Sequence, residues 1–249
     1  MAALYDALDT TILRTDERSS ELIKYASNAY LATKLTFVNE MAEVCEELGA
    51  DIDSVMSGMG HDRRIGTSYL NPGPGWGGSC FPKDTEALVH IAASVDVEFD
   101  FLRNVITLNH RHIRRIADKV ESQLGGSVAD KRVAAWGLTF KAGTDDLRDS
   151  PAIAVLRLLV ERGASIVAYD PAVSVPPEVL PTIEVVDDPL QAVREAESLV
   201  VLTEWPEFTT IDLASVADAM TKPRVVDARN LLDRDRLAEL GFSVTGVGR

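Results

Sequence analysis

The chain has 249 residues, of which 46% are hydrophobic and 26% charged, a composition typical of a globular protein with a sizeable core in one or two domains. Its net charge of −14 argues against general binding to nucleic acids or anionic membranes, because both require a basic surface. A phosphate-bearing small molecule remains compatible, since a few local cations and N–H groups can bind one. Two cysteines, no signal peptide and no membrane-spanning apolar run predict a cytoplasmic protein without disulfides.

The first half of the chain predicts helices. Residues 11–14 resemble a short β-strand, although the neighbouring sequence offers no partner strand. A long helix is expected from about Ser20 to Leu48, and a short helix follows Asp51. A second long helix is expected over residues 99–124. Its apolar stripe exceeds what one small helical layer can cover, which predicts a dimer built on the long helices, chiefly on this one.

A loop rich in glycine and proline separates these helices. Residues 72–79 hold four glycines and two prolines directly before Cys80, and no regular element tolerates that density. The residues after Cys80 predict a helix, so the thiol lies at a helix N-terminus. The helix dipole and Lys83 would favour a thiolate there, which makes Cys80 a candidate nucleophile. The alternative is a structural loop with an incidental cysteine. Cys45 lies on an apolar helix stripe and is expected in the core.

The second half of the chain alternates strands with helices, which predicts a doubly wound parallel sheet. Strands are expected at residues 132–137, 165–169, 184–186, 198–203, 224–227 and 243–245. The first strand lacks a following G-x-G-x-x-G motif, but Lys141, Arg148 and a helix start at Ser150 follow it, a pattern suited to phosphate or ribose. The alternative is a solvated, charged loop. The second strand ends in Asp170, a position that binds ribose in Rossmann folds.

Two further patterns have less specific meanings. Lys24 and Asn28 are four residues apart on one helix and share a face, so they could stabilise an oxyanion together or be merely solvated. Arg63 and Arg64 could bind phosphate or offset the acidic surface. The four histidines show no metal-ligand spacing with cysteines or acids, so no metal site is expected.

Several strings of the chain, in order, resemble the UDP-glucose/GDP-mannose dehydrogenase family. They cover residues 21–32, 37–40, 62–66, 75–84, 140–151 and 169–171, and the Gly-Gly-Ser-Cys-Phe-Pro-Lys-Asp loop is the most specific of them. The Ser-Cys-Phe-Pro-Lys-Asp version is most similar to UDP-glucose 6-dehydrogenases, with GDP-mannose dehydrogenase as the alternative.

The resemblance implies NAD-dependent oxidation of UDP-glucose to UDP-glucuronate. By this match Cys80 forms a thiohemiacetal and then a thioester, Lys24 and Asn28 stabilise the oxyanion, and Asp84 positions or activates water. Lys83 and Arg148 would contact NAD, and in a homodimer Arg64 would reach the partner subunit's substrate site. The residues implied to bind the substrate within the chain are Tyr69, Leu70, Asn71, Pro72, Gly73, Gly77, Lys141 and Arg229.

The resemblance also implies a domain order. Residues 1–18 are interpreted as the remnant of an N-terminal Rossmann domain and are expected to be poorly ordered. Residues 19–124 would form a central all-helical and dimerisation domain with the cysteine loop, and residues 125–249 a C-terminal, Rossmann-like UDP-binding domain. Because the family's G-x-G-x-x-G motif is absent from this sequence, a non-catalytic nucleotide-sugar-binding or dimerisation fragment is the competing hypothesis.

Overall fold

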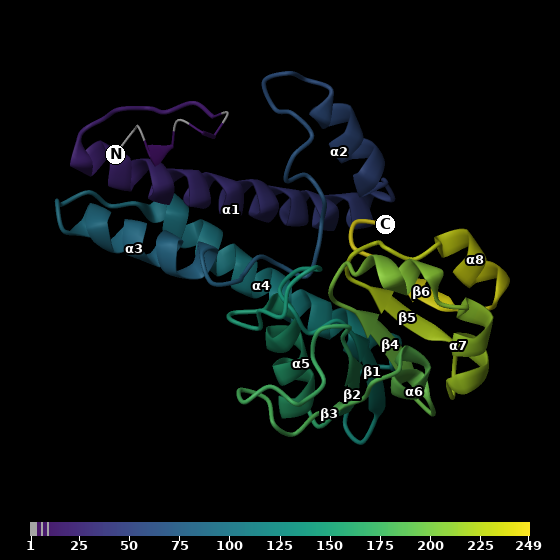
Figure 1. Ribbon diagram of the computed structural model, residues 1–249. Helices are drawn as coiled ribbons and strands as arrows, with labels where there is room; N and C mark the ends of the chain where they lie inside the picture. Colours follow the sequence, from purple (N-terminus) through teal and green to yellow (C-terminus); the bar gives the residue numbers. More distant parts are fainter. Residues whose placement is uncertain (1–3, 6, 9) are drawn as a thin grey trace.

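The computed structural model describes residues 4, 5, 7, 8 and 10–249, which form a helical part followed by an α/β part (Figure 1). In the helical part, α1, α3 and α4 pack against one another, and α2 packs on α1. No helix in the described ranges is both long and apolar enough to cross a membrane. The bounds of the four helices are α1 Glu17–Leu48, α2 Ile52–Gly60, α3 Phe81–Ala93 and α4 Asp100–Gln123.

The first long helix begins earlier than predicted, at Glu17 instead of about Ser20. The Asp16 side chain caps it by accepting a hydrogen bond from the Ser19 N–H at 3.0 Å. Residues 11–14, predicted as a strand, are exposed and adopt no regular structure, because no strand in the described part of the chain pairs with them. Of the segment expected to be poorly ordered, residues 1–3, 6 and 9 lie outside the described residues, whereas 17 and 18 belong to the helix.

The α/β part confirms the predicted doubly wound parallel sheet. Its six strands lie in the order β3-β2-β1-β4-β5-β6, and all neighbouring pairs are parallel. The strand order reverses between β1 and β4, and ligands in such sheets bind at the carboxyl ends of the strands beside this reversal. The strands are β1 Arg132–Trp136, β2 Ser165–Tyr169, β3 Glu184–Val185, β4 Ser198–Val201, β5 Arg224–Asp227 and β6 Ser243–Thr245.

Helices cover both faces of the sheet. On β1, Val133 and Ala135 face a core shared with α4 and α5, whereas Ala134 and Trp136 face a second core shared with α6, α7 and α8. This alternation follows from the two-residue period of a strand. The helices are α5 Pro151–Glu161, α6 Pro189–Val193, α7 Leu213–Ala219 and α8 Arg234–Glu239, and a 3₁₀ helix, η2, covers Pro206–Thr210.

The apolar stripe of α4, which was the reason to expect a dimer interface chiefly on this helix, is mostly buried within the chain. Leu102 and Val105 pack with α1 and α3, whereas Ile113, Ile116 and Val120 join the core against the sheet. One helix thus contributes to two cores along its length, which accounts for the width of its apolar stripe.

Gln123, the last residue of α4, ties this helix to three strands. Its amide donates to the carbonyls of Val225 and Ser243 at 3.0 and 2.9 Å, and its amide oxygen accepts from the Ser198 hydroxyl at 2.8 Å. We therefore expect Gln123→Ala to lower the free energy of unfolding by about 1–3 kcal/mol, because it removes the partner of the buried Ser198 hydroxyl and of the partly buried Val225 carbonyl. Urea unfolding would measure this. Ser122→Ala, at an exposed neighbouring position, should change stability by less than about 0.5 kcal/mol.

Candidate active site

Cys80 lies at the N-cap position of α3, as predicted, directly after the Gly-rich loop. Its side chain is exposed and lies 3.8 Å from the Ser79 hydroxyl, measured between Sγ and Oγ. Cys45, in contrast, is 2% exposed and belongs to the core, also as predicted. Only the first of the two thiols is therefore accessible to a substrate.

Cys80 opens into a cavity of about 460 Å³, here called the cysteine cavity. Its walls come from α1, the Gly-rich loop and the loops that follow β1, β4 and β5, so it lies at the carboxyl edge of the sheet. The structure brings most of the predicted substrate residues together here. Those lining the cavity are Tyr69, Asn71, Gly73, Gly77, Lys141 and Arg229, and the predicted catalytic residue Asn28 lines it as well.

Three predicted substrate residues lie elsewhere. Pro72 lines an adjoining cavity of about 570 Å³, which shares Tyr69, Asn71 and Arg229 with the cysteine cavity. Leu70 is 5% exposed and packs in the core. Arg64 is exposed and pairs with Asp62 at 2.6 Å, outside both cavities.

Tyr69, at the boundary of the two cavities, has a strained backbone. Its φ of 61° places a bulky residue in the left-handed region. Such strain persists only where the surrounding structure enforces it, and it gathers at functional sites. The conformation places the ring of Tyr69 between the two cavities and 6.4 Å from that of Phe81, measured between centroids.

Sequence analysis missed Glu204, which lines the cysteine cavity beside Arg229. The two side chains form an ion pair, with Arg229 Nε 3.0 Å from Glu204 Oε2, and the same Nε donates to the Leu202 carbonyl at 2.9 Å. Burial lowers the pKa of Arg229, while Glu204 and Asp227 oppose that shift; the guanidinium stays charged at neutral pH. The position of Glu204 just after β4, at a strand end, was the available signal.

Lys24 and Asn28 converge on one point, and that point is the Asp84 carboxylate. Lys24 Nζ lies 2.6 Å from Asp84 Oδ2 and Asn28 Nδ2 lies 2.5 Å from the same oxygen, while Lys83 Nζ lies 2.7 Å from Oδ1. Burial raises the pKa of Asp84, but these three donors outweigh it and lower the pKa to about 2. A carboxylate held this way is a weak base, so its geometry suits orientation of Lys24 and Asn28 better than proton abstraction.

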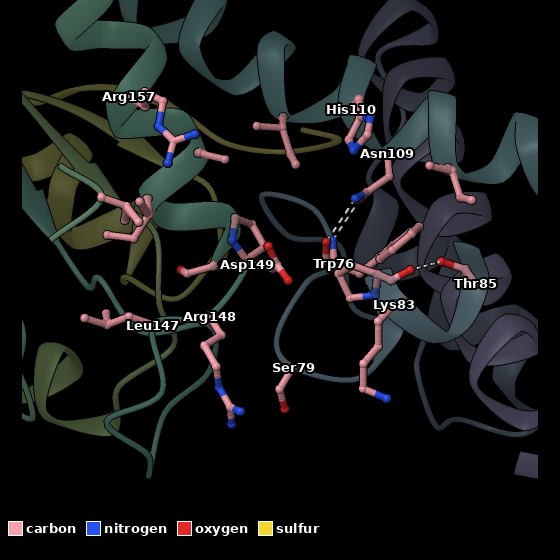
Figure 2. Close-up of a pocket in the computed structure, with 18 of the residues that line it drawn as sticks. Trp76, Ser79, Lys83, Thr85, Asn109, His110, Leu147, Arg148, Asp149 and Arg157 are labelled. Atoms are coloured by element: carbon pink, nitrogen blue, oxygen red, sulfur yellow. Dashed lines mark hydrogen bonds between the residues drawn. The ribbon is translucent and has the colours of Figure 1, made fainter. Parts of the chain in front are cut away.

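A third cavity, of about 810 Å³, lies on the other side of the Gly-rich loop. Trp76 and Ser79 line both this cavity and the cysteine cavity, so the loop forms the wall between them. Figure 2 shows Lys83 and Arg148, the two predicted cofactor contacts, on either side of Ser79. Arg148 also pairs with Asp146 at 2.7 Å. Two cations that line one cavity suit a pyrophosphate group.

Asp170 does not occupy a ribose-binding position, contrary to the analogy with Rossmann folds. It is 3% exposed, and its Oδ2 accepts hydrogen bonds from the backbone N–H groups of Leu138 and Thr139 at 2.7 and 3.0 Å. Trp205 Nε1 also lies 3.2 Å from this oxygen. The carboxylate shapes the turn after β1, which leaves it no free face for a ligand.

The Asp84 interactions predict a pH dependence of stability. The pKa of this carboxyl is lowered from 3.8 to about 2 on folding, so its contribution is fully present above pH 4 and is lost as the pH falls towards 2. We expect the free energy of unfolding of the wild type to fall by up to about 2 kcal/mol more than that of Asp84→Asn over this range. Denaturant unfolding at each pH would measure it. The exposed Asp145, changed to Asn, should leave the wild-type profile intact.

Comparison with known proteins identifies the family. Residues 18–111 match the central domain of the UDP-glucose/GDP-mannose dehydrogenase family, and residues 134–234 match the family's UDP binding domain. A UDP-glucose 6-dehydrogenase of Rhizobium meliloti is 43% identical over 94% of this chain and 54% of its own length. One of Bacillus subtilis is 44% identical over 99% of this chain and 56% of its own.

A solved structure gives the same result. A UDP-glucose dehydrogenase from Pyrobaculum islandicum superposes with a TM-score of 0.85 and 34% identity, over 98% of this chain and 54% of that one. The chain thus spans about half the length of the curated relatives it matches. With both domain matches in family order and the cysteine cavity between them, the chain belongs to the UDP-glucose/GDP-mannose dehydrogenase family.

Proposed function

We propose that the chain binds UDP-glucose and provides the nucleophilic cysteine and the UDP-binding part of an NAD-dependent UDP-glucose 6-dehydrogenase. The observation that carries this proposal is the position of Cys80, an accessible thiol at a helix N-terminus, in a cavity that also holds Lys141 and Arg229. A nucleotide sugar fits this arrangement with its diphosphate near the cations and its sugar C6 over the sulfur.

The proposed chemistry uses Cys80 as a covalent catalyst. Its thiolate attacks the C6 aldehyde, the carbon–sulfur bond forms, and the carbonyl oxygen becomes an oxyanion. Asn28 lines the cavity, and Lys24, which is not among the lining residues, shares the Asp84 Oδ2 atom with it; each retains N–H groups that would donate to the oxyanion. Asp84 holds the two donors in place. Loss of a hydride from C6 would convert the adduct into a thioester on Cys80, and attack by water would then release the carboxylate and the free thiol.

Lys83 and Arg148 are the residues that would hold NAD. Their cationic groups lie on either side of Ser79 and fit the anionic middle of a dinucleotide (Figure 2). Ser79 also lines the cysteine cavity, so the Gly-rich loop would lie between the dinucleotide and the sugar-binding cavity. When bound, NAD would accept a hydride from the sugar C6 in each of the two oxidations, from alcohol to aldehyde and from thiohemiacetal to thioester. The chain's own contribution is to hold the pyrophosphate in a cavity that adjoins the substrate cavity.

Two alternative functions use the same cavity. In the first, the substrate is GDP-mannose instead of UDP-glucose, since the family includes both activities. In the second, the chain binds a nucleotide sugar without turning it over. The names of the curated relatives favour UDP-glucose. Competition between the two nucleotide sugars for the cysteine cavity would separate the first alternative from the main proposal.

We also propose a homodimer that forms on α1 instead of α4. Ile23, Tyr30, Phe37 and Val44 recur every seven residues along α1, and each is between 45% and 64% exposed. A heptad stripe of this kind lines the seam of paired helices. Arg64, exposed on the loop after α2, would then contact the substrate site of the partner subunit.

The role of Cys80 predicts its labelling pattern. Cys80 should react with iodoacetamide at least about tenfold faster than Cys45, because the buried thiol reacts only after local opening. Saturating UDP-glucose should slow the labelling of Cys80 and leave Cys45 unchanged. Mass spectrometry of the two cysteine peptides measures both rates.

Two controls sharpen this experiment. Arg229→Met should abolish protection by UDP-glucose while Cys80 remains reactive in the free protein, since it removes the buried guanidinium but not the thiol. GDP-mannose at equal concentration should protect less. Equal labelling of both cysteines, or no effect of either nucleotide sugar, would contradict the proposed function.

The dimer proposal predicts that Phe37→Glu produces monomers. A charge at the centre of the stripe would be buried without a partner in the dimer, which costs several kcal/mol. Light scattering at micromolar concentration should give twice the 27.1 kDa chain mass for the wild type and the chain mass for the variant. Phe101→Glu, at an exposed position on α4, should remain dimeric. A monomeric wild type, or a monomer only in the α4 variant, would show the interface to be misplaced.

A further inference from the structure

The backbone of the Gly-rich loop is held at Gly73 by buried polar side chains from two helices. The Gly73 N–H donates to Asn39 Oδ1, on α1, at 3.1 Å. The Gly73 carbonyl lies 2.7 Å from Nε2 of His112, on α4. Because a carbonyl only accepts, His112 must carry its proton on Nε2. The N–H and the carbonyl of Gly73 are therefore each hydrogen-bonded to a side chain from a different helix.

Trp76, three residues later, is held in the same way. Its N–H donates to Asn109 Oδ1 and its carbonyl accepts from Asn109 Nδ2, both at 2.9 Å. Its indole Nε1 donates to Thr36 Oγ1 at 2.8 Å. The helices α1 and α4 thus supply one side chain each to Trp76, as they do to Gly73. We call Thr36, Asn39, Asn109 and His112 the loop clamp.

The loop clamp specifies one position of the loop more strongly than an apolar contact would. The four clamp residues are 3–4% exposed, and they satisfy five polar groups of Gly73 and Trp76. A shift of the loop would leave several of these buried groups unpaired, whereas an apolar contact tolerates sliding. Burial lowers the pKa of His112 to about 4, so the clamp is uncharged at neutral pH.

The position of the loop matters because the loop forms the wall of the cysteine cavity. Gly73 faces Arg229 so closely that an added Cβ would lie 2.9 Å from Nη1. Trp76 is followed by Gly77, Gly78, Ser79 and Cys80, so the second point of the clamp lies four residues from the thiol. The clamp thereby holds the loop at one point beside the guanidinium and at another four residues from the thiol, the two ends of the proposed substrate site.

We propose that the loop clamp, and His112 in particular, positions the Gly-rich loop for nucleotide-sugar binding. His112 acts through Gly73 and contacts no ligand, so it is a positioning residue. The identity of the ligand rests on the proposed function, but the effect of His112 on the loop does not.

The test compares His112→Leu with His112→Gln by amide hydrogen exchange and mass spectrometry. Leucine fills the site without a donor, whereas the amide of glutamine can donate to the Gly73 carbonyl. We expect exchange in the peptide spanning residues 72–80 to increase by about tenfold in His112→Leu and to return close to the wild-type rate in His112→Gln. Exchange in the sheet should be unchanged in both. His110→Gln, at an exposed position two residues away on α4, is the matched control.

A second measurement tests whether the position of the loop affects ligand binding. The concentration of UDP-glucose that protects Cys80 from iodoacetamide should rise by about tenfold in His112→Leu and by much less in His112→Gln. If UDP-glucose fails to protect the wild type, the proposed function fails, and the exchange experiment alone still decides the role of the clamp. Unchanged loop exchange in His112→Leu, or an equal rise over the whole chain, would overturn the proposal.

Thr36→Val provides an independent variant should His112→Leu fail to fold. It preserves the shape of the side chain and removes the acceptor of the Trp76 indole N–H, together with a local hydrogen bond from the Thr36 hydroxyl to the Ala32 carbonyl. The clamp predicts faster exchange over residues 72–80 here as well, with the sheet unaffected. Loop exchange at the wild-type rate in Thr36→Val would overturn the proposal for the clamp as a unit.

Discussion

The close approach of two glycines to the segment between β1 and α5 is the contact on which the arrangement of the candidate site depends. A Cβ at Gly77 would lie 2.0 Å from the Asp149 carbonyl, and one at Gly78 would lie 2.7 Å from the Phe140 ring. No side chain fits either position, so the Gly-rich loop can meet this segment only through glycine. The Gly78 N–H then donates to the Asp149 carbonyl at 3.2 Å. This contact brings Cys80, which follows the loop, to the strand ends that present Lys141 and Arg229.

Asp84 plays the corresponding part on the helical side. It is 1% exposed, and it brings Lys24 and Asn28 from α1 to the first turn of α3, next to Cys80. A single buried carboxylate with three donors is a stable arrangement, whereas Lys24 and Lys83 alone would repel each other. The Asp84 carboxylate therefore joins α1 to α3 and also fixes the positions of Lys24 and Lys83. These donors lower the pKa of Asp84, so the carboxylate is unsuited to take a proton.

The fold and part of the candidate site could be predicted from the sequence, for identifiable physical reasons. Alternating apolar segments predicted the parallel sheet, and the density of glycine before Cys80 predicted a loop that ends at a helix. Residues near strand ends, such as Lys141, could be placed at the cavity because parallel strands share one carboxyl edge. Pairings between distant segments could not be predicted in this way. That Lys24 and Asn28 meet Asp84, and that α4 is covered along its whole length, depend on three-dimensional packing that no local pattern encodes.

The charge of the chain constrains how an anionic nucleotide sugar could bind. With a net charge of −14, the protein repels such a ligand at long range, and at physiological ionic strength that field is screened beyond about 8 Å. Recognition must therefore come from short-range contacts. The cations are placed accordingly: Lys24 and Lys83 are held by Asp84, and Arg229 is held by Glu204 and the Leu202 carbonyl. Their partners fix their positions and partly neutralise them. Affinity would then depend on geometry, which makes the rigid placement of the Gly-rich loop as important as the charges themselves.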